Sequence, residues 1–275
     1  MKRYRWLLGC CLFLPIGMLW AADEPDLRML QQKAAQSRDM EGYVGVCKYL
    51  YQTEENPELL LLYADSIHQL ATKSKKPEQL VEYYIWASEG NFIKGDFQQG
   101  YALKRKAIAL AEKVGLKFAI SQSCCDMGYY CNVDARYDSA RYYFRKGLEA
   151  GEDLSEAGEA CRTMLTNYAS SFLFEGKTDS ALVYTIRASE RSAADEDTAM
   201  LIENLNQLGT IYRRKKDLEN CIANFEQALH LCELRGNHNA VAFIYGNIAT
   251  AYCDWNRPGD AIPFSEKAVE YALKT

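Results

Sequence analysis

The chain has 275 residues, enough for one or two ordinary domains or one extended repeat array, and its formal net charge is −5. With 48% hydrophobic residues and only 6 Pro, most of it is expected to fold rather than remain disordered. Acidic and basic residues are well mixed along the chain, with no basic stripe such as a nucleic-acid partner would need.

The segment 1–22 has the layout of a secretory signal peptide. Lys2, Arg3 and Arg5 precede an apolar run over 7–20, and Ala21-Ala22 precede polar sequence. An uncleaved N-terminal anchor is the alternative, because the run is about long enough to span a bilayer with tilt. We therefore expect an exported protein, periplasmic or envelope-associated in a Gram-negative-type bacterium, with membrane contact only through this segment.

Residues 23–76 contain three stretches with helical periodicity, near 25–37, 41–53 and 58–72, and Pro57 suits a helix start. From residue 77 onward, ten further helices are separated by turn signals such as Lys94-Gly95-Asp96. No segment alternates with period two for long enough to be a strand. The ten predicted helices span 77–92, 96–113, 117–132, 137–151, 155–174, 178–193, 197–214, 218–235, 239–254 and 259–273.

These helices form pairs that repeat along the chain with a nearly constant period. A small residue recurs at the same place in the second helix of each pair, namely Gly100, Ala140, Ala181, Cys221 and Ala261. Two antiparallel helices pack closely only where their facing residues are small, and a single hairpin cannot bury its apolar face alone. The pattern predicts an all-α solenoid of stacked helix hairpins.

The pattern resembles the tetratricopeptide repeat, whose first helix carries Leu-Gly-x-x-Tyr and whose second carries spaced Ala and Phe. The best match runs from Leu208-Gly209 to Tyr212, followed by Phe225 and Ala228. The resemblance implies a right-handed α-solenoid with about five repeats over 77–275. A degenerate first repeat over 41–72 falls within the N-terminal helices at 23–76. The spacing of the small residues is longer than the family's usual repeat, so the helices should be longer.

Gly176-Lys177-Thr178 looks like the end of a phosphate-binding loop, but the pattern does not support that reading. Such a loop needs a Gly where this chain has Ser171, and it must follow a β-strand rather than a helix. We expect a turn between helices, with Thr178 or Asp179 as the N-cap. G-x-S-x-G and H-E-x-x-H are absent, so we predict no enzyme; an enzyme of unrecognised type is the alternative.

Cysteine and histidine do not suggest a metal site, and we expect no metal or cofactor. Of the 10 Cys, two lie within the segment 1–22, and most of the others fall at helix positions that pack inward. No C-x-x-C pair occurs, and His68, His230 and His238 make no ligand spacing with the cysteines.

The resemblance implies that the first helix of each hairpin lines a concave face that binds a peptide or protein partner. By periodicity, the first-helix residues on this concave face are expected to be exposed. They include Thr166, Ser170, Glu203 and Thr250. The family's clamp for a C-terminal carboxylate is not expected, because Cys125, Tyr129, Glu203 and Gln207 occupy the corresponding places. Asn167 and Asn247 stand where some family members bond a peptide backbone. The predicted groove residues are Glu82, Glu89, Phe92, Gln122, Tyr129, Asn132, Asn167, Asn206, Thr210, Arg213, Phe243 and Asn247.

The chain also resembles the exported repeat halves of bacterial signalling regulators, which implies a sensor role. At its C-terminal end, Ile262, Val269 and Leu273 are expected to be partly uncovered. This predicts either self-association there or a continuation of the chain.

Overall fold

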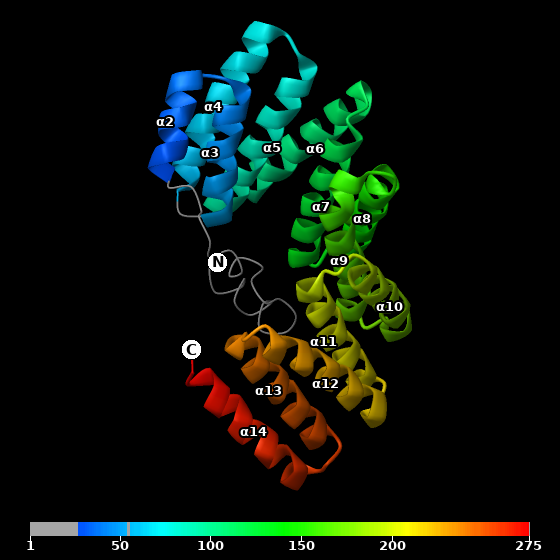
Figure 1. Ribbon diagram of the computed structural model, residues 1–275. Helices are drawn as coiled ribbons and strands as arrows, with labels where there is room; N and C mark the ends of the chain where they lie inside the picture. Colours follow the sequence, from blue (N-terminus) through cyan, green and yellow to red (C-terminus); the bar gives the residue numbers. More distant parts are fainter. Residues whose placement is uncertain (1–26, 54–55, 275) are drawn as a thin grey trace. The chain divides into compact units, whose positions relative to one another are not determined.

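The computed structural model describes residues 27–53 and 56–274, so the predicted signal segment lies outside the described residues. In this part of the chain, thirteen α-helices and one 3₁₀ helix are joined by short turns (Figure 1). The helices are α2 (Leu27–Ser37), α3 (Met40–Thr53), α4 (Pro57–Ser74), α5 (Pro77–Lys94), α6 (Phe97–Val114), α7 (Lys117–Val133), α8 (Tyr137–Gly151), η2 (Ser155–Ala157), α9 (Gly158–Phe174), α10 (Thr178–Ala194), α11 (Thr198–Arg214), α12 (Leu218–Leu234), α13 (His238–Asp254) and α14 (Pro258–Ala272).

The predicted all-α architecture is confirmed, and the predicted helices are all present with ends shifted by a few residues. The largest shift is at 155–174, where a 3₁₀ turn precedes α9. The first helices of the hairpins are α3, α5, α7, α9, α11 and α13, and each is followed by its second helix. No helix in the described ranges is both long and apolar enough to cross a membrane.

The turns are fixed by residues in the left-handed backbone region. Gly176 has φ +79°, and its N–H bonds the carbonyl of Leu173, so Gly176-Lys177-Thr178 is the expected tight turn between α9 and α10. The predicted cap is wrong by one residue. Lys177 is the N-cap and makes no side-chain cap bond, whereas Thr178 already lies in the helix and its hydroxyl bonds the carbonyl of Gly176.

Backbone contacts divide the chain into two compact units. The first contains the described residues up to 130 together with 145–161, and the second contains 131–144 and 162–274. Within the first unit, α2 to α6 pack as successive neighbours, and α3 also contacts α5. Within the second, α10 to α14 do the same, and α11 also contacts α13.

The recurring small residues lie at the close approach of each hairpin. Ala140, Ala181 and Cys221 are completely buried, and Ala261 is nearly so. In the second unit, Cys221 and Phe225 of α12 pack with Leu205 and Leu208 of α11 in the main hydrophobic core. The predicted period therefore corresponds to a real packing contact.

Seven of the eight cysteines in the described segments are buried, and Cys253 is exposed. Burial raises the pKa of the Cys47, Cys124 and Cys232 thiols to about 12, which keeps them in the unreactive protonated form. The interpretation of most cysteines as small core residues is confirmed. At the C-terminal end, Ile262, Val269 and Leu273 are exposed as expected; self-association there stays a prediction.

Two glycines of the second unit provide a direct test of the hairpin contact. A Cβ on Gly209 would lie 2.6 Å from the ring of Phe225, whereas a Cβ on Gly246 of α13 would meet nothing within 4 Å. Gly209→Ala is expected to lower the free energy of unfolding by about 1–3 kcal/mol through overpacking. Gly246→Ala should be neutral or add up to about 1 kcal/mol, because alanine favours the helix.

Urea unfolding of the two variants measures this difference. If Gly209→Ala is as stable as Gly246→Ala, the close contact does not limit the fold.

Candidate functional site

The predicted groove residues are divided between the two units, which are described separately. Glu82, Glu89, Phe92, Gln122 and Tyr129 lie in the first unit, and the remaining seven lie in the second.

In the first unit, a buried lysine holds two acidic side chains of neighbouring first helices. Lys104 of α6 is fully buried; its Nζ bonds the carboxylate of Glu89 on α5 and lies 2.9 Å from Oδ2 of Asp126 on α7. The Tyr130 hydroxyl, also on α7, donates to Glu89 Oε2 at 3.0 Å. Three helices therefore meet through one charged cluster, in which two carboxylates share one ammonium group.

The cluster shifts the protonation of its members. Burial raises the pKa of Glu89 above its ordinary value, and the neighbouring Lys104 opposes that shift. Burial alone would lower the pKa of Lys104, but the carboxylates of Asp126 and Glu89 raise it above its usual value. The lysine therefore stays charged in the core, held there by its carboxylate partners.

Phe92 is a core residue rather than a groove residue. Its side chain is buried, its ring stacks on Tyr130 with centroids 3.7 Å apart, and it meets Tyr101 edge-on at 5.2 Å. A Cβ on Gly100 would lie 2.7 Å from the Phe92 ring, so only a residue without a Cβ admits the ring at this place in the hairpin. The predicted exposure of Phe92 is wrong.

The other predicted residues of the first unit remain accessible. Gln122 is exposed, and Glu82 and Tyr129 are half-buried. Glu82 accepts a hydrogen bond from Trp86 Nε1 at 3.1 Å, and Trp86 meets Tyr51 of α3 edge-on. Burial raises the pKa of Glu82. This part of the first unit is thus acidic and aromatic.

In the second unit, polar side chains link successive first helices. Thr166 Oγ1 of α9 donates to Asn204 Oδ1 of α11 at 2.9 Å, and Gln207 Nε2 of α11 donates to Ser170 Oγ of α9 at 2.6 Å. These hydrogen bonds link α9 to α11 in addition to the apolar contact of Leu173 with Ile211.

Side-chain hydrogen bonds also link α11 to α13, and α7 to α9. Asn247 Nδ2 of α13 donates to Asn206 Oδ1 of α11 at 2.7 Å. Asn132 Nδ2, at the end of α7, donates to the main-chain oxygen of Asn167 on α9 at 3.0 Å. The four asparagines predicted for the groove thus lie in contacting pairs.

These contacts explain why several groove positions are not exposed as predicted. Neighbouring first helices approach so closely that side chains at these positions pack on the next helix, and the polar ones among them pair across the contact. The expectation of exposure is wrong for Glu89, Phe92, Asn132, Thr166, Ser170 and Asn206, all of which are buried, and Asn167 is buried as well.

Two buried acceptors of this network have no partner. Asn132 Oδ1 and Asn167 Oδ1 are inaccessible and make no hydrogen bond, although their residues are only 7% and 3% exposed. An unsatisfied buried acceptor costs about 1–3 kcal/mol. The two contacting asparagines therefore leave two buried carbonyl oxygens that no described residue satisfies.

Glu203 of α11, which lies on the face of the predicted groove, is half-buried. Burial raises the pKa of its carboxyl to about 8, and the carboxylate of Asp197 adds to the shift. The described residues give it no ion pair. Sequence reasoning placed Glu203 on this face but did not foresee that it would be desolvated.

The remaining groove residues of the second unit are half-buried. Arg213 Nε lies 3.6 Å from Asp254 Oδ2, and Thr210 donates to the main-chain oxygen of Asn206 at 3.1 Å. Phe243 packs at the edge of the hydrophobic core.

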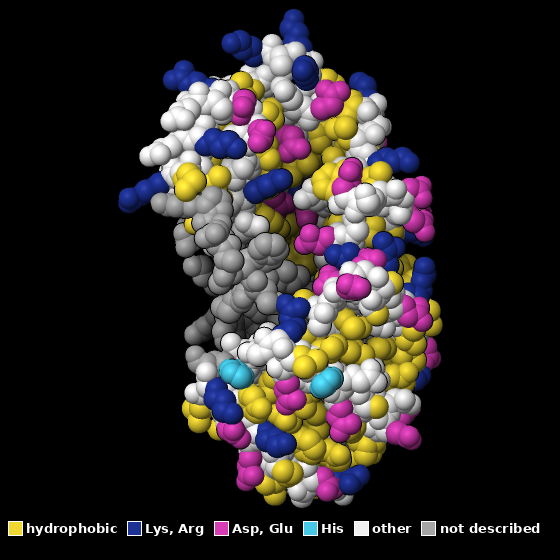
Figure 2. All heavy atoms as spheres, in the orientation of Figure 1, with side chains coloured by type: hydrophobic (Ala, Val, Ile, Leu, Met, Phe, Trp, Pro, Cys, Tyr) yellow, Lys and Arg dark blue, Asp and Glu magenta, His cyan; other side chains and the backbone are white. Residues whose placement is uncertain are grey.

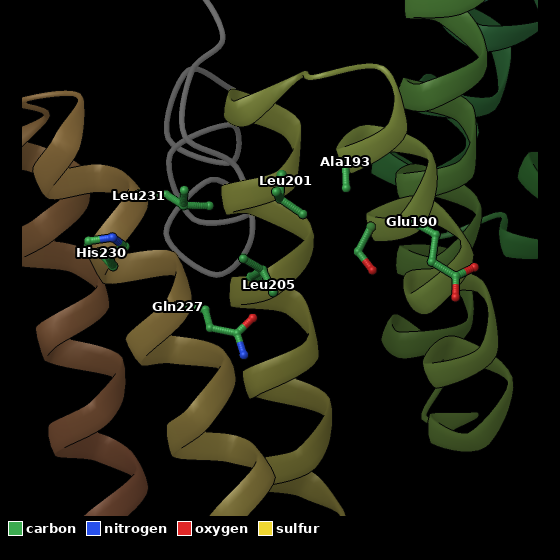
Figure 3. A pocket seen from close by; sticks show the side chains of 8 residues that line it. Glu190, Ala193, Leu201, Leu205, Gln227, His230 and Leu231 are labelled. Carbon is green, nitrogen blue, oxygen red and sulfur yellow. The ribbon is translucent and has the colours of Figure 1, made fainter.

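A second feature of this unit is an open hollow of about 450 Å³ between two second helices. Figure 3 shows Leu201 and Leu205 of α11 at its centre, Glu190 and Ala193 of α10 on one side, and Gln227, His230 and Leu231 of α12 on the other. None of the predicted groove residues lines it. It is an apolar depression with a polar rim, and it contains no catalytic grouping.

Neither the charge distribution nor the acidic and thiol side chains suggest another kind of site. Figure 2 shows acidic and basic side chains interspersed over the visible face. No group of three or more His, Cys, Asp or Glu side chains that could hold a metal ion occurs within the described segments.

Comparison with known proteins identifies the repeat. Residues 197–274 match the family model described as tetratricopeptide repeat. The tetratricopeptide repeat is therefore matched in sequence over the last part of the array, 197–274. No curated protein matches the chain in sequence.

Solved tetratricopeptide-type structures resemble most of the chain. BtubC (BKLC) from P. vanneervenii aligns with a TM-score of 0.67 and 16% identity, over 91% of this chain and 92% of that one. The apo form of RapI aligns with a TM-score of 0.71 and 11% identity, over 90% and 70%. A Rap protein complexed with Competence and Sporulation Factor aligns with a TM-score of 0.62 and 11% identity, over 90% and 70%. At such identities the likeness concerns the fold, and it confirms the tetratricopeptide-type solenoid.

The buried lysine of the first unit gives a second test of the fold. Lys104→Met would leave Glu89 buried without its main partner, and we expect a loss of about 3–5 kcal/mol of unfolding free energy. Lys113→Met on the exposed side of the same helix should change stability by less than about 0.5 kcal/mol.

Adding Glu89→Gln to Lys104→Met removes the stranded charge and should recover part of the loss. If the double variant is no more stable than Lys104→Met alone, the pairing of these two charges is not what the lysine provides.

Proposed function

We propose that this protein is a binding scaffold that holds an extended peptide, or an extended segment of a protein partner, along the first helices of its second unit. The observation that carries the proposal is the pair of buried, unpartnered carbonyl oxygens of Asn132 and Asn167. An extended peptide presents free N–H groups along its backbone, and these donors would satisfy the two oxygens if the buried asparagine side chains turn toward the peptide on binding.

The similar structures support this proposal. A Rap protein has been seen in complex with Competence and Sporulation Factor, and it shares this fold. A repeat array without a catalytic grouping is suited to binding, and we therefore favour a scaffold over an enzyme. A sensor part of a signalling regulator is the role we propose for it, since binding at the groove would be its input.

Substitution of the asparagines tests the groove. A random nonapeptide library displayed on phage is selected against the purified protein, and the enriched peptides are synthesised. Asn167→Ala is expected to weaken their binding about tenfold, the effect of losing one hydrogen bond worth about 1.4 kcal/mol. Asn224→Ala on α12, outside the first helices, is the control and should bind as the unaltered protein does.

Circular dichroism and thermal unfolding of both variants establish that each is folded. If folded Asn167→Ala binds every selected peptide with unchanged affinity, the Asn132–Asn167 contact of the second unit is not part of the binding site.

We also propose that the protein is exported. The support is the sequence of residues 1–22, with three basic residues before an apolar run. Alkaline phosphatase fused after residue 30 should be active in a Gram-negative host, and Leu14→Arg in the apolar run should abolish that activity. Activity that survives Leu14→Arg would count against export through this segment.

A further inference from the structure

The groove side of the second unit contains hydrogen-bond acceptors that are not matched by donors. Asn132 Oδ1 and Asn167 Oδ1 are buried without partners, and Glu203 adds a half-buried carboxylate that forms no ion pair with any described residue. The three groups come from three consecutive first helices, α7, α9 and α11.

Contacts between α9 and α11 show which part of α11 carries Glu203. Asn204 and Gln207 of α11 bond Thr166 and Ser170 of α9, and Asn167 lies between those two residues in the chain. Glu203 precedes Asn204 directly and is one turn before Gln207, so it lies on the same stretch of the helix contact. Glu203 therefore lies on the part of α11 that packs beside α9, the helix that carries Asn167.

The cationic side chains of the first helices in this unit are already engaged. Arg162 Nη1 and Nε each lie 2.9 Å from a carboxylate, those of Asp195 and Asp197. Arg213 lies beside Asp254, and Arg214 Nη1 of α11 donates to the main-chain oxygen of Leu173 at 2.7 Å. None of these arginines is recorded as a partner of Glu203.

The unmatched acceptors and the engaged arginines together indicate which ligand group would complement this site. A lysine ammonium has three donors and no acceptor, and an arginine guanidinium has five donors and no acceptor. Above its raised pKa of about 8 the Glu203 carboxyl is ionised, so an acidic ligand would be repelled by it and a neutral peptide would leave its charge unmatched. We infer that the groove of the second unit recognises a basic side chain, lysine or arginine, of the bound peptide, with Glu203 as its counter-ion.

This inference rests on the proposed function and makes it more specific. The resulting site has the opposite polarity to a carboxylate clamp, because acceptors on the protein face a cation on the ligand. Charge complementarity thus selects one class of peptide among those that an extended groove could hold.

The test compares selections on the random nonapeptide library at pH 8.5 and 0.15 M salt. Glu203 is replaced by Gln, and Glu226→Gln on the exposed side of α12 is the matched control, because it removes the same charge outside the groove. We expect lysine or arginine to be enriched at one peptide position with the unaltered protein and with Glu226→Gln. That enrichment should be absent with Glu203→Gln.

The affinities of a selected peptide, and of its version with norleucine in place of the basic residue, are then measured for the unaltered protein and for Glu203→Gln. The four affinities give the coupling between Glu203 and the basic residue. For the unaltered protein the replacement should weaken binding about tenfold or more, and for Glu203→Gln less than about twofold. Thermal unfolding shows that both variants are folded.

The outcomes separate this inference from the proposed function. If peptides are enriched without a basic residue and Asn167→Ala weakens them, the groove binds peptides and the inference is overturned. If both glutamate variants lose the basic preference equally, the attraction is a general effect of net charge and the inference is again overturned. If no peptide is enriched, the proposed function and the inference both fail.

Discussion

The close approach of two helices within each hairpin is the constraint on which the rest of this structure depends. It requires a small residue on one helix and a large ring or aliphatic chain on the other, as Gly100 meets Phe92 and Gly209 meets Phe225. Once this contact repeats at nearly constant spacing along the chain, the hairpins have a fixed thickness and stack. Neighbouring first helices are then brought together, and whatever side chains they carry must either pair with one another or bind something else.

Polar side chains take part in that second contact in both units. In the first unit a lysine from a second helix reaches between two first helices and gathers their carboxylates. In the second unit threonine, serine, asparagine and glutamine side chains bond from one first helix to the next. Buried hydrogen bonds of this kind add little net stability, but they penalise every arrangement that leaves them unmade. They therefore define how the first helices align.

The sequence predicted the helices well, because their periodicity and turn residues are local and strong. Gly95, Gly176 and Gly236 all adopt the left-handed conformation that their place between helices implied. The repeat unit was equally visible, since the small residues of the close contact recur at almost constant spacing.

The candidate site was predicted less well, because helical periodicity shows which side a residue faces but not what it meets there. Asn206 and Asn132 point to the predicted side and are nevertheless buried, since each bonds an adjacent first helix. Lys104 gave a signal that could have been read. It lies four residues after the small residue Gly100, and the same position of the later repeats is occupied by Phe144, Thr185, Phe225 and Ser265. A charged residue at such a position needs a buried counter-ion.

The polar contacts have a consequence for the way this array could have been assembled. Repeats of a solenoid are often regarded as interchangeable modules, but here each contact between hairpins has its own chemistry. Lys104 fits only where Glu89 and Asp126 flank it, and the amides of Asn206 and Asn247 complement only each other. Exchanging two hairpins would strand a charge or an amide at the new boundary. The polar contacts therefore specify the order of the hairpins, and duplication of a single hairpin could not reproduce these contacts.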